Sequence, residues 1–227
     1  MKKILDDVYL IQGIGSANVF LLASGSGFIL IDSGIFMQTN QLIDRMVKAG
    51  FSLTDLKMIV LTHCHCDHIG GAAELVRQSN AKVAAHEEDI PFITQEKVIT
   101  GPYHHMMIEE QKYMNRFGCQ IRHVDITLHD GGVIDVLGGL DVISVPGHTP
   151  GSIALYQADR KIMFFGDVIR NNDKHGLTAG VPEKFNCDTA QTKNDARKLI
   201  GYPIDHALFS HGDPILFNAS EYLSGLT

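Results

Sequence analysis

Apolar and polar positions follow two different rhythms along the first half of the chain. Residues 17–23 and 27–32 are rich in Val, Ile, Leu and Phe, and Ser24-Gly25-Ser26-Gly27 separates them, which is the pattern of two antiparallel strands joined by a hairpin turn. Residues 40–49 place apolar side chains three and four positions apart and end at Gly50, which is typical of a helix. The predicted elements of this half are strands at 7–11, 17–23, 27–32, 57–61 and 82–86, and helices at 40–49 and 71–78.

The second half repeats the order of strands first and helices afterwards. Glycine pairs at 131–132 and 138–139 separate short apolar runs. The predicted elements are strands at 121–127, 133–136, 140–145, 152–157, 161–166 and 205–210, and a helix at 188–200. Because each half places strands before helices, we predict an α/β protein in which two mixed β-sheets pack face to face with helices on the outer faces. This four-layer αββα sandwich would make one domain of residues 1–227.

The segment 91–118 is long for a connection and carries apolar residues at helical spacing, including several methionines. We predict a helical lid over the functional site or a dimer contact, because methionine side chains adapt to varied apolar partners. A plain surface helix that packs on its own domain explains the pattern equally well. His104 and His105 in this segment are expected to be solvated.

Composition and charge narrow the class of partner. The 44% of hydrophobic residues is typical of a globular protein, and a formal net charge of −7 gives no basic surface for nucleic-acid backbones. No stretch approaches the roughly 18 apolar residues of a membrane span, and Asp6 and Asp7 precede any apolar signal region. Four cysteines do not make a disulfide framework for a chain of this length. We expect a cytoplasmic protein that acts on a small molecule, with no nucleic-acid or membrane partner.

The run His63-Cys64-His65-Cys66-Asp67-His68 is the strongest chemical signal in the sequence. Imidazole nitrogens and carboxylate oxygens are ligands that zinc, iron and manganese accept. The run lies between a predicted strand and a predicted helix, so it forms a strand-to-helix loop that can hold adjacent metal ions. Cys64 and Cys66 alternate with the histidines, so we expect both to be packed thiols that point away from the metal. A His-rich solvated loop is the alternative.

Three further candidates stand where predicted strands end. His148 lies in Val145-Pro146-Gly147-His148-Thr149-Pro150-Gly151, a turn that proline and glycine make rigid. Asp167 ends the apolar run Met163-Phe164-Phe165-Gly166, where an unpaired buried carboxylate would be costly without a cation. His211 follows Ala207-Leu208-Phe209-Ser210. Each residue alone would more often be a cap or a solvated side chain, but together with the 63–68 run they indicate metal ligands.

These seven residues, in this order along nearly the whole chain, resemble the metallo-β-lactamase superfamily. The resemblance implies an αββα sandwich with a two-metal site. One divalent ion would be held by His63, His65 and His148, the other by Asp67, His68 and His211, and Asp167 would bridge both. Zinc is the expected metal, with iron and manganese as alternatives. Asp32, at the end of the run Phe28-Ile29-Leu30-Ile31, also matches a family position. We interpret it as a residue that orients a ligand imidazole; the alternative is a helix N-cap.

A dinuclear centre of this kind implies hydrolysis by a bridging hydroxide, with Asp67 as the catalytic residue that passes a proton to the leaving group. The expected substrates are small esters, thioesters or lactones. β-Lactams are not expected, because β-lactamases of the main class have Cys at the position of Asp167. The loop Thr149-Pro150-Gly151-Ser152 resembles glyoxalase-II-like thioesterases, but only 16 residues follow His211 (227 − 211), too few for a glutathione-binding helical domain. The alternative function is a persulfide dioxygenase with one iron held by His63, His65 (or His148) and Asp167. The loop 171–186, with Lys174, His175 and Lys184, could supply a cation for an anionic substrate.

Overall fold

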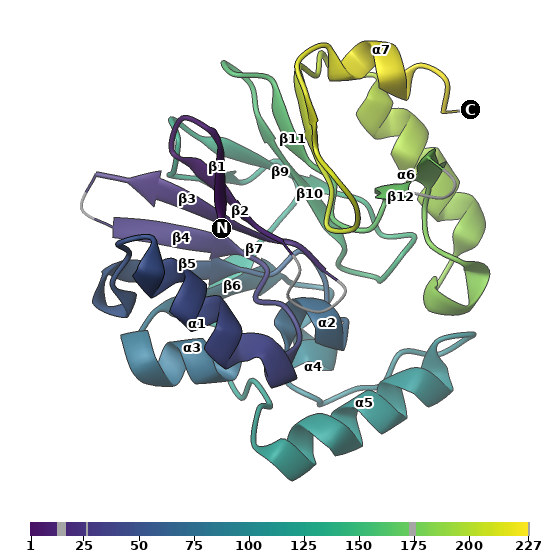
Figure 1. The fold of residues 1–227 in the computed structure, drawn as a ribbon. Coiled ribbons are helices and arrows are strands. Elements are labelled where there is room, and N and C mark those ends of the chain that lie inside the picture. Colours follow the sequence, from purple (N-terminus) through teal and green to yellow (C-terminus); the bar gives the residue numbers. More distant parts are fainter. Residues whose placement is uncertain (13–16, 26, 173–175, 227) are drawn as a thin grey trace. The chain divides into compact units, whose positions relative to one another are not determined.

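The computed structural model describes residues 1–12, 17–25, 27–172 and 176–226, which fall into two compact units (Figure 1). Unit 1 comprises residues 1–98 and 104–128. Unit 2 comprises residues 99–103 and the described residues from 129 onward. The organisation of residues 1–227 as one domain stays a prediction.

Unit 1 is built on a seven-stranded mixed sheet whose spatial order follows the sequence. Its first four strands pair antiparallel, and the pairs from β4 onward are parallel. The strands are β1 (Lys2–Leu5), β2 (Val8–Ile11), β3 (Val19–Ser24), β4 (Gly27–Ile31), β5 (Leu56–Val60), β6 (Lys82–His86) and β7 (Ile126–Leu128). The parallel strands end at one edge of the sheet, so the loops that follow β4 and β5 are neighbours.

Helices of unit 1 lie along one face of this sheet (Figure 1). Helix α1 (Thr39–Lys48) buries Leu42 and Met46, and α3 (Ala72–Ser79) buries Ala72 and Leu75 while it contacts β5 and β6. Their spacing of apolar residues every three to four positions explains both the helices and the buried faces. The short helices η1 (Phe36–Gln38), η2 (Leu53–Asp55), α2 (Cys66–Ile69) and α4 (Ile90–Ile93) complete the connections.

Within the segment predicted to be helical, 91–118, helix α5 (His104–Phe117) forms and buries Met107 and Met114. It packs inside unit 1, where Phe36 stacks on Phe117 at 5.1 Å between ring centroids and Tyr113 reaches the sulfur of Met37 at 3.2 Å. The prediction of a helix is therefore confirmed. The lid and dimer roles stay predictions, and His105 is exposed as expected.

Unit 2 contains a six-stranded mixed sheet in the order β15-β14-β11-β10-β9-β8, with one parallel pair between β11 and β14. Its strands are β8 (Val133–Ile134), β9 (Leu140–Ser144), β10 (Ile153–Gln157), β11 (Ile162–Phe164), β14 (His206–Leu208) and β15 (Ile215–Leu216). Helix α6 (Thr189–Ile200) and helix α7 (Ala219–Leu223) cover one face of this sheet, and η3 (Glu183–Phe185) lies ahead of α6.

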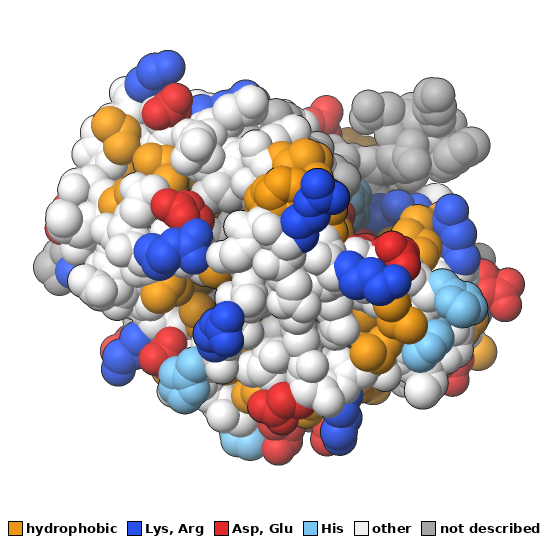
Figure 2. Space-filling model, turned by 90° about the horizontal axis from the view of Figure 1, so that it is seen from below, with side chains coloured by type: hydrophobic (Ala, Val, Ile, Leu, Met, Phe, Trp, Pro, Cys, Tyr) orange, Lys and Arg blue, Asp and Glu red, His pale blue; other side chains and the backbone are white. Residues whose placement is uncertain are grey.

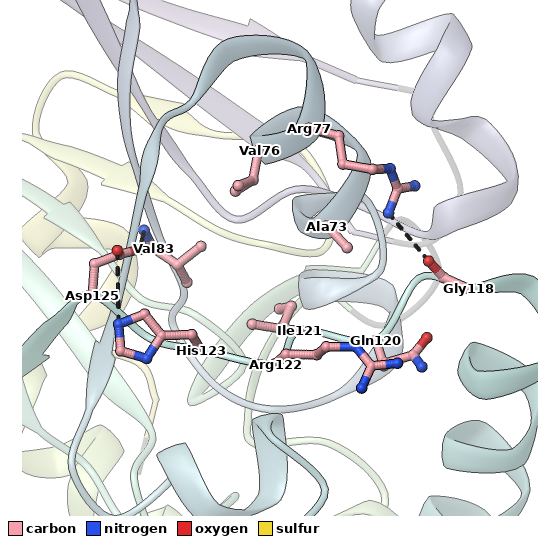
Figure 3. Close-up of a pocket in the computed structure, with 10 residues that line it drawn as sticks. All are labelled: Ala73, Val76, Arg77, Val83, Gly118, Gln120, Ile121, Arg122, His123 and Asp125. Atoms are coloured by element: carbon pink, nitrogen blue, oxygen red, sulfur yellow. Dashed lines mark hydrogen bonds and ion pairs between the residues drawn. The ribbon is translucent and has the colours of Figure 1, made fainter.

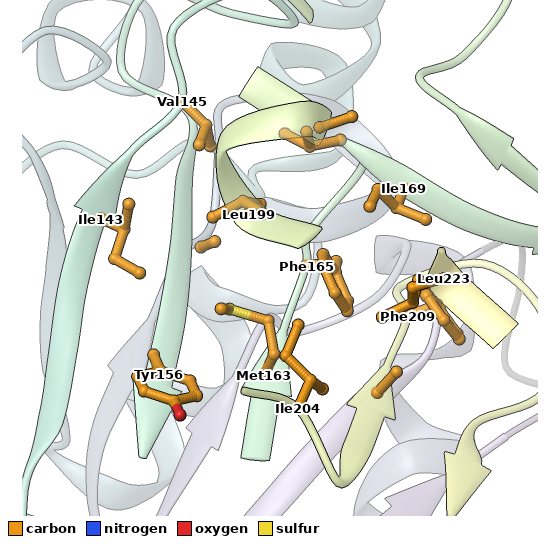
Figure 4. Close-up of a cluster of buried hydrophobic side chains, with 14 of the residues drawn as sticks. Ile143, Val145, Tyr156, Met163, Phe165, Ile169, Leu199, Ile204, Phe209 and Leu223 are labelled. Carbon is orange, nitrogen blue, oxygen red and sulfur yellow. The ribbon is translucent and has the colours of Figure 1, made fainter. Parts of the chain in front are cut away.

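The core of unit 2 forms where α6 and α7 meet the sheet (Figure 4). Phe165 stacks on Phe209 with 5.3 Å between ring centroids, and Leu199 of α6 and Leu223 of α7 are fully buried in the same cluster. Burying such side chains stabilises each by about 1.5–3 kcal/mol relative to exposure. This packing holds the ends of β9, β11 and β14 in place, and the loops that carry His148, Asp167 and His211 begin at these ends.

The structure corrects several predicted elements. The strand predicted at 121–127 is wrong over 121–125, because β7 begins only at Ile126. Just ahead of β7, the side chain of Asp125 takes the backbone N–H of Val83, which a continuing strand would pair with a carbonyl. Strand β1 and the hairpin β12 (Ile169–Asn172) to β13 (Gly176–Ala179) were not predicted, since strands of four residues are too short to show a clear apolar alternation. Ser26 of the predicted hairpin turn lies outside the described residues, as do Lys174 and His175. The fold class, with two mixed sheets and helices, is confirmed.

Two general features bear on the expected partners. Among the described residues, no helix has the length and apolar content needed to cross a membrane. On the face drawn in Figure 2, acidic, basic and hydrophobic side chains of the described residues are interspersed, without the continuous basic surface that nucleic-acid backbones attract.

Candidate metal-binding site

In unit 1 the candidate ligands follow the end of β5. His63 and His65 lie in the loop, and α2 begins directly after His65, which leaves Asp67 and His68 on the first turn of this helix. The three imidazoles gather closely: the ring centroid of His63 is 4.7 Å from that of His65 and 3.9 Å from that of His68. All three are buried, and Asp67 is partly exposed. The 63–68 run therefore forms a compact cluster and not a solvated loop.

Asp32 lies at the centre of the hydrogen bonds behind this cluster. It follows β4 with a left-handed backbone (φ 62°), a conformation that Asp tolerates better than most residues. Its Oδ2 is 2.8 Å from Nδ1 of His68, and its side chain is buried. Because a carboxylate only accepts, Nδ1 of His68 carries the proton and Nε2 keeps a lone pair for a metal. The N-cap alternative is wrong: the following helix η1 is preceded by Ile35, without a side-chain cap.

Thr62 extends this arrangement to a second imidazole. Its backbone N–H donates to Oδ1 of Asp32 at 2.8 Å, and its hydroxyl donates to the same carboxylate at 2.9 Å. The hydroxyl oxygen can then accept from Nδ1 of His63, which lies 3.1 Å away. Thr62 thus orients His63 as Asp32 orients His68. Sequence reasoning missed Thr62, although its position between the strand and the first histidine was visible.

Backbone packing holds the Asp32 loop against the turn that carries His68. Ser33 donates from both its backbone N–H and its hydroxyl to the carbonyl of His68, each at 2.7 Å. At Gly71 a Cβ atom would lie 2.4 Å from the carbonyl oxygen of Ser33, so only glycine permits this approach. The Gly70-Gly71 pair after the ligand run therefore serves close packing.

The two cysteines of the run have different surroundings from the histidines. Cys64 is buried, and Cys66 lies next to Glu110 of α5. Burial, followed by the negative charge of Glu110, raises the pKa of the Cys66 thiol well above its usual range. That both thiols point away from the metal ions stays a prediction. The burial of Cys64 and the position of Cys66 beside Glu110 favour it.

In unit 2 His148 is oriented by a residue that the sequence did not reveal. Its Nδ1 is 3.0 Å from Oδ1 of Asn186, and both side chains are buried. The amide nitrogen of Asn186 donates to the carbonyl of Val181 and to the hydroxyl of Thr189, which fixes the amide oxygen toward His148. His148 therefore carries its proton on Nδ1 and presents Nε2.

The turn that carries His148 is anchored to the start of α6. Backbone N–H groups of Cys187 and Asp188 donate to the carbonyls of His148 and Gly147, at 3.0 and 2.9 Å. Gly147 lies so close to α6 that a Cβ atom would be 2.1 Å from the backbone nitrogen of Thr192. The rigid turn expected from its Pro-Gly sequence is thus held by the helix as well.

Asp167 lies between two histidines of unit 2. Its Oδ2 is 3.7 Å from Nε2 of His148, and its Oδ1 is 3.2 Å from Nε2 of His211. The carboxylate is 5% exposed, whereas His211 is 20% exposed. A buried carboxylate with a different imidazole at each oxygen is chemically suited to divalent cations.

Nδ1 is therefore engaged by the protein in three imidazoles, those of His63, His68 and His148. Nε2 lies 3.7 Å from a candidate ligand carboxylate in both His68 and His148. His and Asp groups of this kind could hold metal ions. The donor set of nitrogen and carboxylate oxygen fits zinc, iron or manganese, as the sequence predicted.

Comparisons with known proteins agree with this chemistry. The profile of the metallo-beta-lactamase superfamily matches residues 13–211. A probable metallo-hydrolase of Bacillus subtilis, YflN, is 25% identical over 88% of this chain and 81% of its own length. The human acyl-coenzyme A thioesterase MBLAC2 is 30% identical over 74% of this chain, and a hydroxyacylglutathione hydrolase of Shewanella baltica is 27% identical over 93%. The chain spans 65% and 62% of the lengths of these last two proteins.

A solved structure shows the same fold. The metallo-beta-lactamase family protein TTHA1429 of Thermus thermophilus superposes with a TM-score of 0.73 at 21% identity, over 98% of this chain and 80% of that protein. Because the family profile covers most of the sequence, the chain belongs to the metallo-β-lactamase superfamily and is one of its metallo-hydrolases.

Proposed function

We propose that this protein hydrolyses small acyl thioesters at a dinuclear metal centre. The ligand clusters of the two units would serve one centre: His63, His65 and His148 for one divalent ion, Asp67, His68 and His211 for the other. Asp167 would be shared between the ions. Zinc is the proposed metal.

The observation that carries this proposal is the position of Asp167. Its two oxygens face Nε2 of two different histidines within unit 2, as expected of a carboxylate that is shared by two ions. The two halves of the ligand set also complement each other chemically. Unit 1 contributes three buried imidazoles with one partly exposed carboxylate, and unit 2 contributes two imidazoles with the buried carboxylate.

Bound divalent ions would supply Lewis acidity, which lowers the pKa of water and polarises a substrate carbonyl. The chain's own residues do the remaining work. Asp32, Thr62 and Asn186 hold the imidazoles in the tautomer that presents Nε2. Asp67, with its side chain 23% exposed, would take the proton of the attacking water and pass it to the leaving thiolate.

A thioester is the proposed substrate because two relatives are named for thioester chemistry, an acyl-coenzyme A thioesterase and a hydroxyacylglutathione hydrolase. A thiolate is also a good leaving group, so proton transfer by a single partly exposed carboxylate suffices. Oxygen esters and lactones are the comparison substrates.

The first test counts metals per chain in freshly purified protein by plasma mass spectrometry, and then measures thiol release from acyl-coenzyme A and acyl-glutathione thioesters. We expect close to two divalent ions and thiol release that a chelator abolishes. Close to one iron per chain, with oxygen uptake on a persulfide, would replace this proposal by a dioxygenase. Two metals with cleavage of lactones alone would refute the thioester assignment.

The role of Asp167 has its own test. Asp167→Asn keeps the shape but removes the charge, and we expect loss of at least one metal and a fall in thiol release of more than about 100-fold. Asp159→Asn, a surface change of the same kind, is the matched control. Full activity of Asp167→Asn in a folded protein would disprove the shared-ligand role.

A further inference from the structure

Unit 1 contains a cavity whose lining includes none of the candidate metal ligands. It measures about 430 Å³, within the range of small-molecule sites. It lies between α3, the start of β6 and the segment 118–125 (Figure 3). This is the segment for which the predicted strand is wrong. Asp125 pairs with Val83 of β6 through its backbone and its side chain, and Ile121, Arg122 and His123 of the same segment form one wall of the cavity.

The cavity has an apolar middle and polar ends. Ala73, Val76, Val83 and Ile121 supply aliphatic side chains from three separate segments. Figure 3 shows His123 and Asp125 toward one end, and Arg77, Gly118 and Gln120 toward the other. An elongated ligand with an apolar body and a polar head matches this distribution.

Most polar groups of the lining already have partners. Arg77 bonds to Glu74 and to the carbonyl of Gly118, at 3.2 Å for the latter. Asp125 accepts from the backbone of Val83 at 2.8 Å and lies 3.9 Å from Nε2 of His123. These contacts engage the polar groups at both ends of the cavity and hold its walls together.

Arg122 and Gln120 differ from these residues. Among the described residues, no ion pair or hydrogen bond is recorded for the Arg122 side chain, although it lines the cavity. Oε1 of Gln120 is buried and has no hydrogen-bond partner within the described chain. A buried amide without a partner is unusual and calls for an explanation. Both residues line the cavity. With the amide rotated, its N–H group and the guanidinium would donate to one anionic head group.

We propose that this cavity binds an amphipathic carboxylate, such as a medium-chain fatty acid. The chain lies against Ala73, Val76 and Ile121, and the carboxylate is held by Arg122 and Gln120. A guanidinium binds a carboxylate through two parallel hydrogen bonds, which favours this head group over an alcohol. The site does not depend on the proposed thioesterase activity, because no ligand of the metals takes part.

The test is a titration of the isotope-labelled, metal-containing protein with octanoate, followed through backbone amide NMR shifts. Octanol and octylamine serve as neutral and cationic probes of the same chain length. We expect saturable shifts at residues 118–125 and on α3 with octanoate, and at least about tenfold weaker binding of octanol. Octanoate shifts confined to the 61–68 loop, equal affinity for octanol, or preference for octylamine would each overturn the proposal.

Two variants place the ligand within the cavity. Arg122→Gln should weaken octanoate binding about tenfold and leave octanol binding unchanged. Arg116→Gln removes the same charge from exposed α5 and is the matched control. Ala73→Leu extends a side chain into the cavity from α3 and should block both ligands (Figure 3). Circular dichroism verifies the fold of each variant. Unchanged octanoate affinity in folded Arg122→Gln and Ala73→Leu would refute the site.

Discussion

Asn186 accepts a hydrogen bond from His148 across 38 positions of sequence, at 3.0 Å between Oδ1 and Nδ1. This contact decides which nitrogen of the imidazole is available to a metal. Asn186 is itself held through its amide nitrogen by Val181 and Thr189, so its orientation cannot reverse without the loss of two hydrogen bonds. Asp32 fulfils the same role for His68 in unit 1.

Removal of the Asn186 side chain should weaken metal binding, although Asn186 is not itself a proposed ligand. For Asn186→Ala we expect zinc affinity to fall by about 10- to 100-fold, since His148 loses its fixed tautomer and orientation. Competition with a chromogenic chelator measures this affinity. Asn186→Asp keeps the acceptor and should retain more affinity than the alanine variant. Asn194→Ala on the exposed face of α6 is the control, and equal zinc affinity of all variants would contradict the orienting role.

Thr62 should contribute to both stability and metal affinity. Thr62→Val removes the hydroxyl that donates to Asp32 and faces His63, so the free energy of unfolding of the metal-stripped protein should fall by about 1–3 kcal/mol. Thr62→Ser keeps the hydroxyl and should lose less. Urea unfolding measures the difference. If Thr62→Val unfolds with the same free energy as the parent protein, the hydrogen bonds of the Thr62 hydroxyl do not contribute to stability.

The thiols of Cys64 and Cys66 should be dispensable for metal binding. In the double variant Cys64→Ser, Cys66→Ser we expect an unchanged metal content, because both cysteines alternate with the histidines and should point away from the metal ions. Plasma mass spectrometry of protein purified under identical conditions gives the comparison. A loss of one metal per chain would show that a thiolate is a ligand.

His206 should make stability depend on pH in unit 2. Burial lowers its pKa below the usual 6.5, and its Nδ1 accepts from the backbone N–H of Phe217 at 3.3 Å. Below pH 6.5 the unfolded chain therefore binds more protons than the folded protein, so the stabilising contribution present above pH 6.5 is lost as the pH falls through the lowered pKa. His206→Asn, which keeps an acceptor, should lose less thermal stability than the parent protein between pH 7.5 and 5.5.

Thermal midpoints at both pH values, measured on the same preparation, provide this comparison. His105→Gln on the exposed face of α5 serves as the control, because other histidines contribute to the pH dependence of both proteins. The same pH-dependent loss in His206→Asn and the parent protein would exclude His206 as its source.

Local sequence was sufficient to predict those helices and strands whose apolar spacing shows which face is buried. The strand at 152–157 and the helix at 188–200 were predicted within one residue of β10 and α6, because apolar spacing directly reports which face is buried. The ligand candidates were also visible, since a run of three His and one Asp, followed by His or Asp at the ends of three later predicted strands, is an uncommon pattern. In contrast, residues 121–125 were predicted to be part of a strand, but β7 begins only at Ile126.

The sequence by itself determined the superfamily, the two-sheet α/β class and the residue types that could hold metals, because all three follow from residue types and their order and spacing along the chain. Only the tertiary structure decided that Thr62 and Asn186 orient His63 and His148, that Asp167 lies between two imidazoles, and that a cavity opens beside Arg122. The physical reason is that hydrogen-bond partners and cavities depend on which distant segments meet, and this is set by the packing of sheets and helices rather than by any local pattern.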